Sequence, residues 1–545
     1  MADPILASPI ATPEPFYSFH IFLFPFEWHS GDNPAATLEE KTALGQIERI
    51  MSQSGHWERR GSWLDPEALV HYNEANYFYD FVRPVLYDTG KPDSFQRHYY
   101  HIAASQGGLS YAIQCKNGPT YKLEIDDIVV SFYDTGVGLL AFHLYNRESA
   151  HSAPDDILRI NQFGRRLYPP FYGTDTGQLG KQAFFEDKNW SRGLDTVQGA
   201  ELAQSISLEA HGQPWIKEDY ADWRIRATLD QSPGLIRLLL PAPLMQQISL
   251  SPVLDDRMFV VCWYGNDELI AQIQGQDSSN DYVHNDWWYQ YIFVDGGFKT
   301  CQNDDMAAEL LKAHTNARWS KSGTFFGVSR YSLVCLTQTF SKESFSKVIC
   351  SHVQTMYYKI ALLGLVQRAC LLRFSSEVTD ISQMANGDRK VASKVSSLYR
   401  QYLRFVNKIF FREVTAQEQG IEIYDLLQQH MRLSDHVKDL ELEIQELHQY
   451  ADLLEEKRRN DRLDILTYIG ALFVVPSFIG TYYSIAGVTL EEDWMEIPFL
   501  LLLALSGGTA YALVHSRKQW RWVWGFVLLL LMTYVLFIYP NNIAK

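Results

Sequence analysis

Cysteine is scarce in this 545-residue sequence, and no two cysteines form a CxxC pair. We therefore expect reduced, packed thiols of a cytoplasmic domain rather than a disulfide framework. The six cysteines are Cys115, Cys262, Cys301, Cys335, Cys350 and Cys370.

The common catalytic signatures are also missing: there is no P-loop, GxGxxG, GxSxG or HExxH. His98 and His101 could share one helical turn, but they have no Cys or carboxylate at ligand spacing, so we interpret them as packed or surface histidines. Met1 to Pro15 lacks the basic start of a signal peptide. These absences argue against an enzyme and against a secreted protein.

Positive charge is in deficit, with 48 Lys and Arg against 64 Asp and Glu, a net charge of -16. This balance argues against nucleic acid as a general partner, although a local basic pocket is compatible with it.

Apolar residues, in contrast, concentrate at the C-terminal end. Three runs with few or no charged residues predict membrane-spanning helices at about 465–488, 497–514 and 522–540. Basic residues precede the first run and separate the second from the third, whereas the first linker is acidic. Basic flanks stay in the cytoplasm. We therefore expect a multi-pass protein of the inner (plasma) membrane whose N-terminal domain is cytoplasmic.

The rest of the chain divides by pattern. Residues 1–15 are a flexible lead, 16–340 an α/β sensor domain, 341–464 a helical stalk and 465–545 the transmembrane region. The fold class is an α+β domain on a coiled-coil-like stalk. Aromatic and β-branched runs predict five strands, and two segments of the sensor domain predict helices. The strands are Phe16–Trp28, Tyr121–Tyr133, Gly138–Tyr145, Arg257–Tyr264 and Tyr289–Val294, and the helices are Thr37–Ser52 and Asp304–Asn316.

The predicted stalk contains two long helices, Ser346–Phe374 and Lys390–Phe411, and then a heptad stripe from Ile423 to Leu454. A stripe of this kind packs either within a helical hairpin of one chain or between subunits. With a small shift the stripe continues into the first apolar run, where it holds mainly small and hydroxyl residues. These either pack against another helix or line a pore. The pore-lining candidates are Asn460, Leu463, Thr467, Gly470, Val474, Ser477, Thr481 and Ser484.

Arg459-Asn460, Leu463, Leu466-Thr467 and Pro476-Ser477-Phe478-Ile479 resemble the pore helix of CorA-type divalent-cation transporters. The resemblance covers about residues 341–522 and implies a funnel-shaped homopentamer with the first span lining the pore. The family's Gly-Met-Asn filter is replaced by Ser484, Ile485 and Ala486, so a Mg²⁺ filter of the usual chemistry is not expected. The outer loop with Glu491, Glu492, Asp493 and Glu496 either concentrates cations or is simply solvated.

A large N-terminal domain without that signature resembles, within this family, the CorA-like membrane effectors of type III CRISPR systems. The resemblance implies antiviral defence triggered by a nucleotide second messenger, an S-adenosylmethionine–AMP conjugate. Two stretches rich in Arg, aromatic, amide and Gly residues are candidates for its pocket, or else for an interface between domain and stalk. The candidates are Asn161, Arg165, Arg166 and Tyr168 in one stretch and Asn316, Arg318, Trp319, Phe326 and Arg330 in the other.

The sequence thus predicts a ligand-gated channel or membrane effector that contacts the bilayer, its own copies and a small nucleotide. The alternatives are a divalent-cation transporter with an altered filter, a membrane-tethered enzyme, and a scaffold.

Overall fold

The computed structural model describes residues 15–30, 40–60, 69–91, 94–115, 118–167, 203–219, 232–254, 257–275, 281–297, 299–340, 344–384 and 390–485. The chain divides into two compact units, each considered by itself. The first contains Met1–Ser382 and Ser397–Ile444, and the second contains Gln383–Ser396 and Gln445–Lys545.

A mixed sheet forms the centre of the first unit. Thirteen strands of the described residues join it in the order β11-β12-β13-β10-β1-β6-β5-β4-β7-β8, with β9 on β1 and β2-β3 on β5. Strands β10 and β13 are parallel, and the remaining pairs are antiparallel. The strands are β1 Ser18–Ser30, β2 Trp57–Arg59, β3 Gln96–His101, β4 Leu109–Cys115, β5 Thr120–Tyr133, β6 Val137–Asn146, β7 Ala203–Ala210, β8 Gln213–Asp219, β9 Ile248–Pro252, β10 Phe259–Gly265, β11 Thr315–Asn316, β12 Phe325–Val328 and β13 Ser332–Thr337.

The described helices are distributed over the two units. They are α1 Glu40–Gln53, α2 Leu69–Asn76, α3 Arg83–Leu86, α4 Ile102–Ser105, α5 Pro154–Gly164, α8 Gly234–Leu239, α9 Ala242–Gln247, α10 Asp267–Gln274, α11 Asp286–Phe293, α12 Asp304–His314, α13 Ser344–His352, α14 Tyr358–Ser382, α15 Lys390–Lys408, α16 Glu418–Met431 and α17 Leu433–Ile485. Helices α15 and α17 each contain residues of both units. Three short 3-10 helices, Ser149–His151, Asp281–His284 and Ser320–Ser322, and one π-helix, Val353–Tyr357, interrupt this series.

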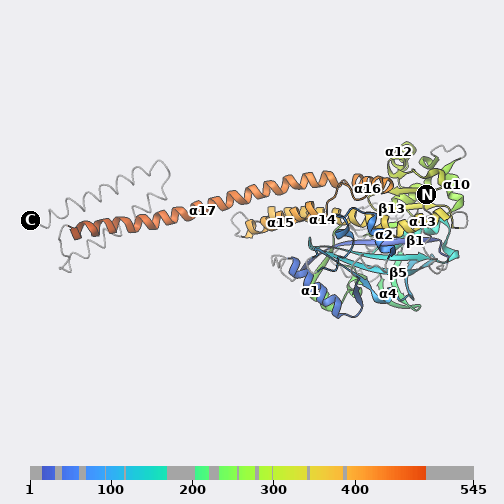
Figure 1. The fold of residues 1–545 in the computed structure, drawn as a ribbon, viewed down its shortest axis with the longest axis horizontal. Coiled ribbons are helices and arrows are strands. Elements are labelled where there is room, and N and C mark those ends of the chain that lie inside the picture. The colour runs from blue at the N-terminus through green and yellow to red at the C-terminus, as the bar shows by residue number, and fades with distance from the viewer. Residues whose placement is uncertain are drawn as a thin grey trace, which may run out of the picture. The chain divides into compact units, whose positions relative to one another are not determined.

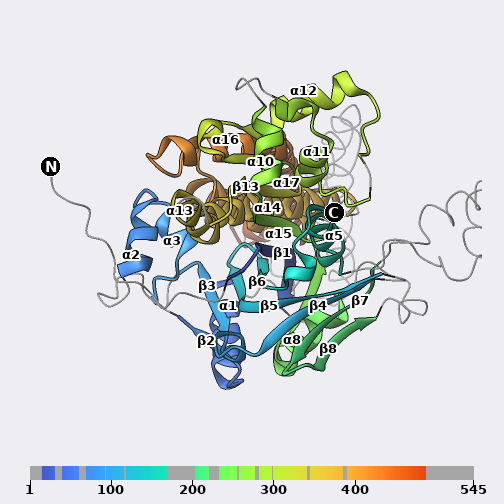
Figure 2. The same ribbon diagram turned by 90° about the vertical axis from the view of Figure 1, so that its right-hand side faces the viewer.

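The central strands are buried on both faces, which is why their sequences are almost continuously apolar. Phe22, Phe24 and Phe26 of β1 belong to one large apolar core, together with Phe142 of β6 and residues of α5 and α11. The opposite face is covered by α14. Figures 1 and 2 show α14 on one side of the sheet and α1 on the other. We call the side under α14 the α14 face.

Several sequence-based expectations match these elements. The runs Phe16–Trp28, Tyr121–Tyr133, Gly138–Tyr145 and Arg257–Tyr264 correspond to β1, β5, β6 and β10. The run Tyr289–Val294, however, is not a strand. Its residues up to Phe293 lie in α11, and Val294 caps that helix with a left-handed backbone (φ 56°). The start of α11 is fixed by the Asn285 side chain, which accepts a hydrogen bond from the backbone N–H of Trp288 at 2.8 Å. An N-cap of this kind satisfies an otherwise free helix donor and overrides the β propensity of the aromatic residues.

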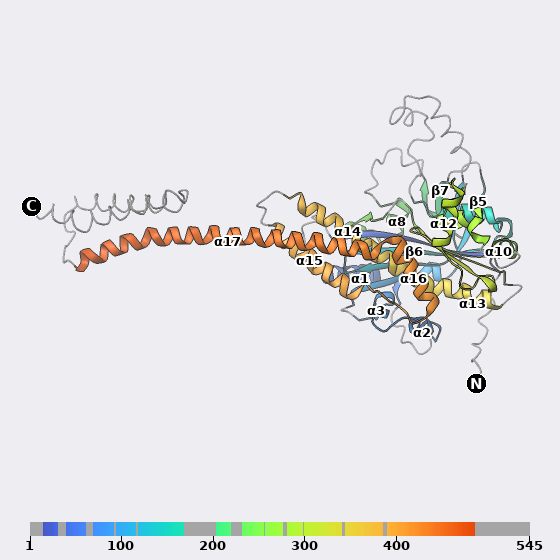
Figure 3. The same ribbon diagram turned by 90° about the horizontal axis from the view of Figure 1, so that it is seen from above.

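The heptad stripe does not follow one helix. Arg432 has a left-handed backbone (φ 54°) that ends α16, and α17 begins at the next residue. On both sides of this break the stripe is buried within the chain, as at Ile423 and Leu440. Tyr402 of α15 donates a hydrogen bond to the carbonyl of Val437 at 3.5 Å. Up to Ile444 the stripe therefore packs inside one chain, and α16 lies beside α14 (Figure 3).

The predicted transmembrane region is corrected by the structure. Among the described residues, none of the helices combines the length and the apolar character that a bilayer requires. Where the side chains of α17 are described beyond Gln445 they are mainly charged and exposed, as at Glu455, Lys457, Arg462 and Asp464. The fold is a sheet-rich mixed one, not the predicted α+β domain, stalk and membrane helices. The multi-pass membrane location and the ion-channel interpretation are wrong for the described part of the chain.

The pore candidates from Asn460 to Ser484 lie on α17, and so do Ser484 and Ile485 of the filter position. Ala486, the acidic loop with Glu491, Glu492, Asp493 and Glu496, and the runs 497–514 and 522–540 lie outside the described residues. The predicted homopentamer stays a prediction, because the structure describes a single chain.

Candidate functional site

The α14 face is unusually polar for a buried sheet surface. Side chains alternate along a strand, and the register places His98 of β3 opposite Ser131 of β5. On β6, His143 pairs with Asp127 across a bulge in β5. His98 and His143 are 4% and 8% exposed, so both imidazoles lie under α14 and not in solvent. Two buried histidines from separate strands thus share one covered face.

Lys359, near the start of α14, lies next to this face of the sheet. The π-helix Val353–Tyr357 leads directly into α14, and Tyr358 and Lys359 are its first two residues. Single π turns occur frequently at functional sites because they re-aim side chains within a helix. The Lys359 Nζ lies 3.4 Å from the carbonyl oxygen of Leu86 and 5.2 Å from the ring centroids of Tyr87 and Tyr358. Lys359 is half-buried, so it connects the covered face with the surface.

We call Lys359, His98, His143, Tyr87 and Tyr358 the Lys359 cluster. The rings of His143 and Tyr358 meet edge to face with centroids 4.7 Å apart. His98 uses Nδ1 in a 2.6 Å hydrogen bond with the Ser131 hydroxyl. His98 also has a backbone hydrogen bond with Val85, whereas among the described residues the buried Nε2 atom of His143 and the hydroxyl of Tyr87 have no hydrogen-bond partner. Buried polar atoms are nearly always paired, so two such atoms beside one lysine make this cluster a candidate ligand site.

Burial and Lys359 together keep both histidines uncharged. Burial lowers the pKa of His98 and of His143 to about 3, and the nearby Lys359 ammonium adds to the effect. Burial also lowers the pKa of Lys359 to about 8, with a small opposing contribution from Glu74. The Tyr358 pKa is raised well above its usual value because the phenol is buried. At neutral pH the cluster therefore offers one ammonium group among neutral imidazoles and phenols.

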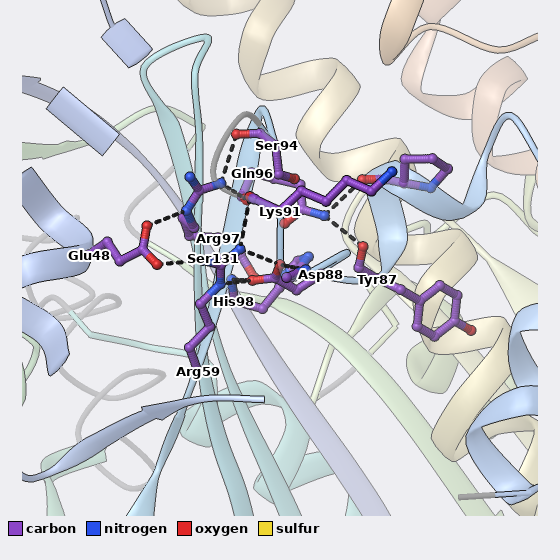
Figure 4. A network of polar contacts seen from close by, with 12 residues as sticks. Glu48, Arg59, Tyr87, Asp88, Lys91, Ser94, Gln96, Arg97, His98 and Ser131 are labelled. Atoms are coloured by element: carbon purple, nitrogen blue, oxygen red, sulfur yellow. Dashed lines mark hydrogen bonds and ion pairs between the residues drawn. The ribbon is translucent and has the colours of Figure 1, made fainter. Parts of the chain in front are cut away.

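A network of ion pairs and hydrogen bonds, drawn in Figure 4, holds the chain segment that contains Tyr87 and Asp88. Arg59 of β2 donates two hydrogen bonds to the Asp88 carboxylate, at 2.6 and 2.7 Å, and a third to Glu48 of α1. Burial alone would raise the pKa of Asp88, but the hydrogen bonds from Arg59 and the Gly90 backbone outweigh it and lower that pKa. Arg97 donates to the other oxygen of Glu48 at 3.0 Å.

Gln96 completes this support. Its side-chain amide donates to the carbonyl oxygens of Pro84 and Tyr87, each at 2.7 Å (Figure 4). The backbone N–H of His98 donates to Asp88 at 3.3 Å. The segment Arg83–Asp88, which presents Leu86 and Tyr87 to Lys359, is therefore held from both ends. Since one strand, β3, carries both Gln96 and His98, the network fixes the histidine and the tyrosine relative to each other.

The sequence-predicted Asn161 lies on the opposite face, on α5. Its side-chain oxygen pairs with His20 Nδ1 at 2.7 Å, and Cys262 Sγ lies 3.4 Å from the same nitrogen. A Cys-His-Asn catalytic set requires the cysteine and the asparagine on different imidazole nitrogens. Burial raises the pKa of the Cys262 thiol to about 12 and lowers that of His20 to about 4. The group is a packed hydrogen-bond chain without a nucleophile.

Two of the neighbouring candidates have contacts within the chain, and their role in ligand binding stays a prediction. Arg165 is 3% exposed and donates to the carbonyl of Val294 at 3.4 Å. The backbone of Arg166 pairs with that of Arg257 in an isolated antiparallel β-bridge. Tyr168 lies outside the described residues.

The second stretch of candidates forms an interface with α16. Arg318 Nε lies 3.0 Å from both carboxylate oxygens of Glu422, and Asn316 donates to the same carboxylate at 2.6 Å. Trp319 donates to the Gln419 side chain at 2.9 Å. This arrangement matches the interface interpretation of these residues, and the pocket interpretation stays an untested prediction. The two predicted stretches therefore contact different parts of the fold. Asn161 and Arg165 contact His20 and Val294, whereas Asn316 and Arg318 contact α16.

Phe326 and Arg330 extend that interface. The Phe326 ring packs edge-on against Tyr357 with centroids 5.2 Å apart. Arg330 donates to the carbonyl of His430 at 3.3 Å, and the His430 ring stacks on His314 with centroids 3.6 Å apart. We call these contacts between residues 314–331 and α16 the α16 interface.

Sequence reasoning missed the Lys359 cluster. Lys359 lies inside a long helical run and belongs to no motif, and the sequence predicts His98 and His101 only as packed or surface histidines. His98 and His101 are on strand β3 and both are buried, so they do not share a helical turn. The described residues contain no group of His, Cys, Asp or Glu arranged to hold a metal ion.

Comparison of the chain with protein-family models, curated proteins and solved structures gives no match.

Proposed function

We propose that this protein is a ligand-responsive sensor that binds a small anionic ligand of the nucleotide type at the Lys359 cluster. The observation that carries the proposal is the pair of buried, unpartnered polar atoms of His143 and Tyr87 beside a half-buried lysine. Hydrogen bonds from the ligand would give these polar atoms partners. Ligand binding would thereby remove the free-energy cost of leaving them unpaired.

The chemistry of the cluster favours a phosphate-bearing aromatic ligand. The Lys359 ammonium binds an anionic oxygen as a point charge. The imidazole nitrogens of His98 and His143 donate or accept according to tautomer, which suits the edge of a base. The faces of Tyr87 and Tyr358 are the aromatic surfaces next to the lysine. The S-adenosylmethionine–AMP conjugate implied by the sequence resemblance combines a base with a phosphate and is therefore one of the ligands to test.

Binding is a better account of the cluster than catalysis. A general base works best with a pKa near the working pH. Both histidines have pKa values of about 3, which makes them weak bases at neutral pH. They are suited to hydrogen bonding with a ligand and not to removing protons from it.

The site is connected to the helices beyond it through α14. The Gln367 side chain donates to the carbonyl of Ile409 at 2.8 Å and to the Tyr424 hydroxyl of α16 at 3.0 Å. A ligand that prefers one position of α14 would therefore shift the packing of α16, because a ligand moves an equilibrium by its difference in affinity for the two states.

Isothermal titration with AMP, ATP, S-adenosylmethionine and the S-adenosylmethionine–AMP conjugate tests the proposal. Lys359→Met should weaken binding of the preferred ligand at least tenfold. Lys347→Met, which removes an exposed lysine of the neighbouring α13, is the matched control and should bind as the unaltered protein does. Equal affinity of the Lys359→Met variant and the control, or no binding of any of the four, would show that the cluster is not a nucleotide site.

A further inference from the structure

His430 interrupts the heptad stripe with a polar side chain, whereas the positions on either side of it in the stripe, Leu426 and Leu433, are apolar. A polar residue in such a stripe costs stability and can specify one particular contact. The His430 ring stacks on that of His314, the last residue of α12, with centroids 3.6 Å apart and an angle of 10° between the rings. We call these two residues the histidine pair.

Both rings of the histidine pair are hydrogen-bonded to backbone carbonyls. His314 Nδ1 lies 2.6 Å from the carbonyl oxygen of Val328, and His430 Nε2 lies 3.2 Å from that of Ala313. Because a carbonyl oxygen only accepts, each of these two nitrogens carries a proton and donates it. The neutral pair therefore makes both hydrogen bonds, and a second proton on either ring adds charge without adding to these bonds.

The surroundings keep the pair uncharged at neutral pH. The pKa of His430 is lowered to about 4, first by burial and then by His314, with the hydrogen bond to Ala313 acting in the opposite direction and Arg330 adding a further decrease. Burial also lowers the pKa of His314. If α16 separated from residues 314–331, both rings would reach water and regain an ordinary pKa of 6.5. The separated arrangement then binds more protons, so the contact weakens as the pH falls below about 6.5.

Charged groups of both signs belong to the elements around the pair. Arg330, in the turn between β12 and β13, donates to the carbonyl of His430 at 3.3 Å, which places a cation next to the pair. Glu422 of α16 accepts from Arg318, and its pKa is lowered, so it stays ionised while the histidines titrate. The other ionisable residues are Asp295 after α11, Glu309 and Lys312 of α12, Arg368 of α14, Asp425 of α16, and Arg432, Asp435 and His436 after α16. Because His436 is a histidine close to the end of α16, it provides the control used below.

We infer that the histidine pair is an acid-sensitive contact that loosens α16 from residues 314–331 when the rings are protonated. Two imidazolium rings stacked at this short distance repel each other, and Arg330 adds a third positive charge. The loosening would begin at the end of α16, next to the left-handed residue Arg432, and would reach α14 through the hydrogen bond between Gln367 and Tyr424. The inference does not depend on the ligand proposed above.

Hydrogen exchange of the α16 amides at pH 7.5 and pH 5.0 tests this contact, with protection factors corrected for the intrinsic exchange rate at each pH. Protection of α16 should fall by about tenfold or more relative to that of the central strands, because the pKa of His430 is about 4 in the contact and 6.5 outside it. The comparison with the central strands removes the general destabilisation by acid, to which His98 and His143 contribute.

Two variants assign the effect to the pair. His430→Phe keeps a flat ring against His314 and removes one titrating group, so the acid-induced loss of protection in α16 should be smaller by about fivefold or more. His436→Gln removes the neighbouring histidine, which is not part of the stack, and should show the full loss. A loss in His430→Phe as large as in the unaltered protein, or a loss abolished by His436→Gln, would overturn the inference.

NMR titration of the unaltered protein gives a second test that needs no substitution. The imidazole signals of His314 and His430 should titrate in coupled steps, because the charge of each ring acts on the other. The amide signals of α16 should shift in the same pH range. Amide signals of α16 that stay constant while both rings become protonated would also overturn the inference.

Discussion

The guanidinium of Arg318 lies against the carboxylate of Glu422, with Nε 3.0 Å from each oxygen, and joins segments 104 residues apart in the sequence. Asn316 donates to the same carboxylate. The hydrogen bond from Arg318 is the main cause of a lowered pKa at Glu422. One carboxylate of α16 thus receives two donors from the sheet side of the α16 interface, and its loss should loosen α16 more than it lowers overall stability.

Glu422→Gln should increase amide hydrogen exchange in α16 and leave that of the central strands unchanged. The amide side chain cannot accept both donors in the way that a carboxylate does. Glu418→Gln is the matched control: Glu418 is 77% exposed and lies 3.5 Å from Arg318. If exchange in α16 were equal in the two variants, the Glu422 contacts would not hold the helix.

Acid should destabilise the first unit through its buried histidines. His98 and His143 have folded-state pKa values of about 3, against an ordinary value of 6.5. Between these values the unfolded chain binds more protons, so the free energy of unfolding falls as the pH falls from about 6.5 towards 3. Each histidine should account for about 3 kcal/mol between pH 7 and pH 4.

Urea unfolding at pH 7 and pH 4 measures this loss. Carboxylates contribute to it too, so the informative quantity is the difference from a His143→Gln variant, whose loss should be smaller by about 3 kcal/mol. An identical loss in both proteins would mean that His143 is already protonated in the folded state at pH 4.

Lys359 should lower stability at neutral pH, as a residue kept for binding often does. Burial lowers its pKa from 10.5 to about 8. Since the unfolded chain holds the proton more tightly, stability rises as the pH increases from about 8 towards 10. Lys359→Met should therefore be more stable than the unaltered protein by about 1–3 kcal/mol at pH 7. The difference should shrink by pH 9.5. A constant difference across this range would assign it to packing and not to charge.

The sequence predicts more of the fold than of the site. The strands β1, β6 and β10 were predictable because they are buried on both faces, which makes their sequences mostly apolar, and β5 because its first half alternates exposed and buried residues. The end of α16 at Arg432 was not, since the heptad stripe passes through it without a gap and only the backbone turns. The Lys359 cluster depends on residues at 87, 98, 143 and 359, which no local pattern connects. The sequence singles out Arg318 and Trp319, but no local pattern predicts their hydrogen bonds to Glu422 and Gln419 of α16.

Gly138 should be among the least replaceable residues of the sheet. A Cβ at this position would lie 2.3 Å from the Phe26 ring and 2.9 Å from the carbonyl oxygen of Ser131. The ring belongs to the main apolar core and the carbonyl to the paired strand β5, so neither can move away cheaply. Gly138→Ala should lower the free energy of unfolding by about 1–3 kcal/mol.

Gly45→Ala is the control, because nothing lies within 4 Å of its Cβ position in α1. It should raise stability by up to about 1 kcal/mol through helix propensity. Urea unfolding of the two variants should therefore give changes of opposite sign. A neutral Gly138→Ala would show that β1 and β6 can separate enough to admit a methyl group.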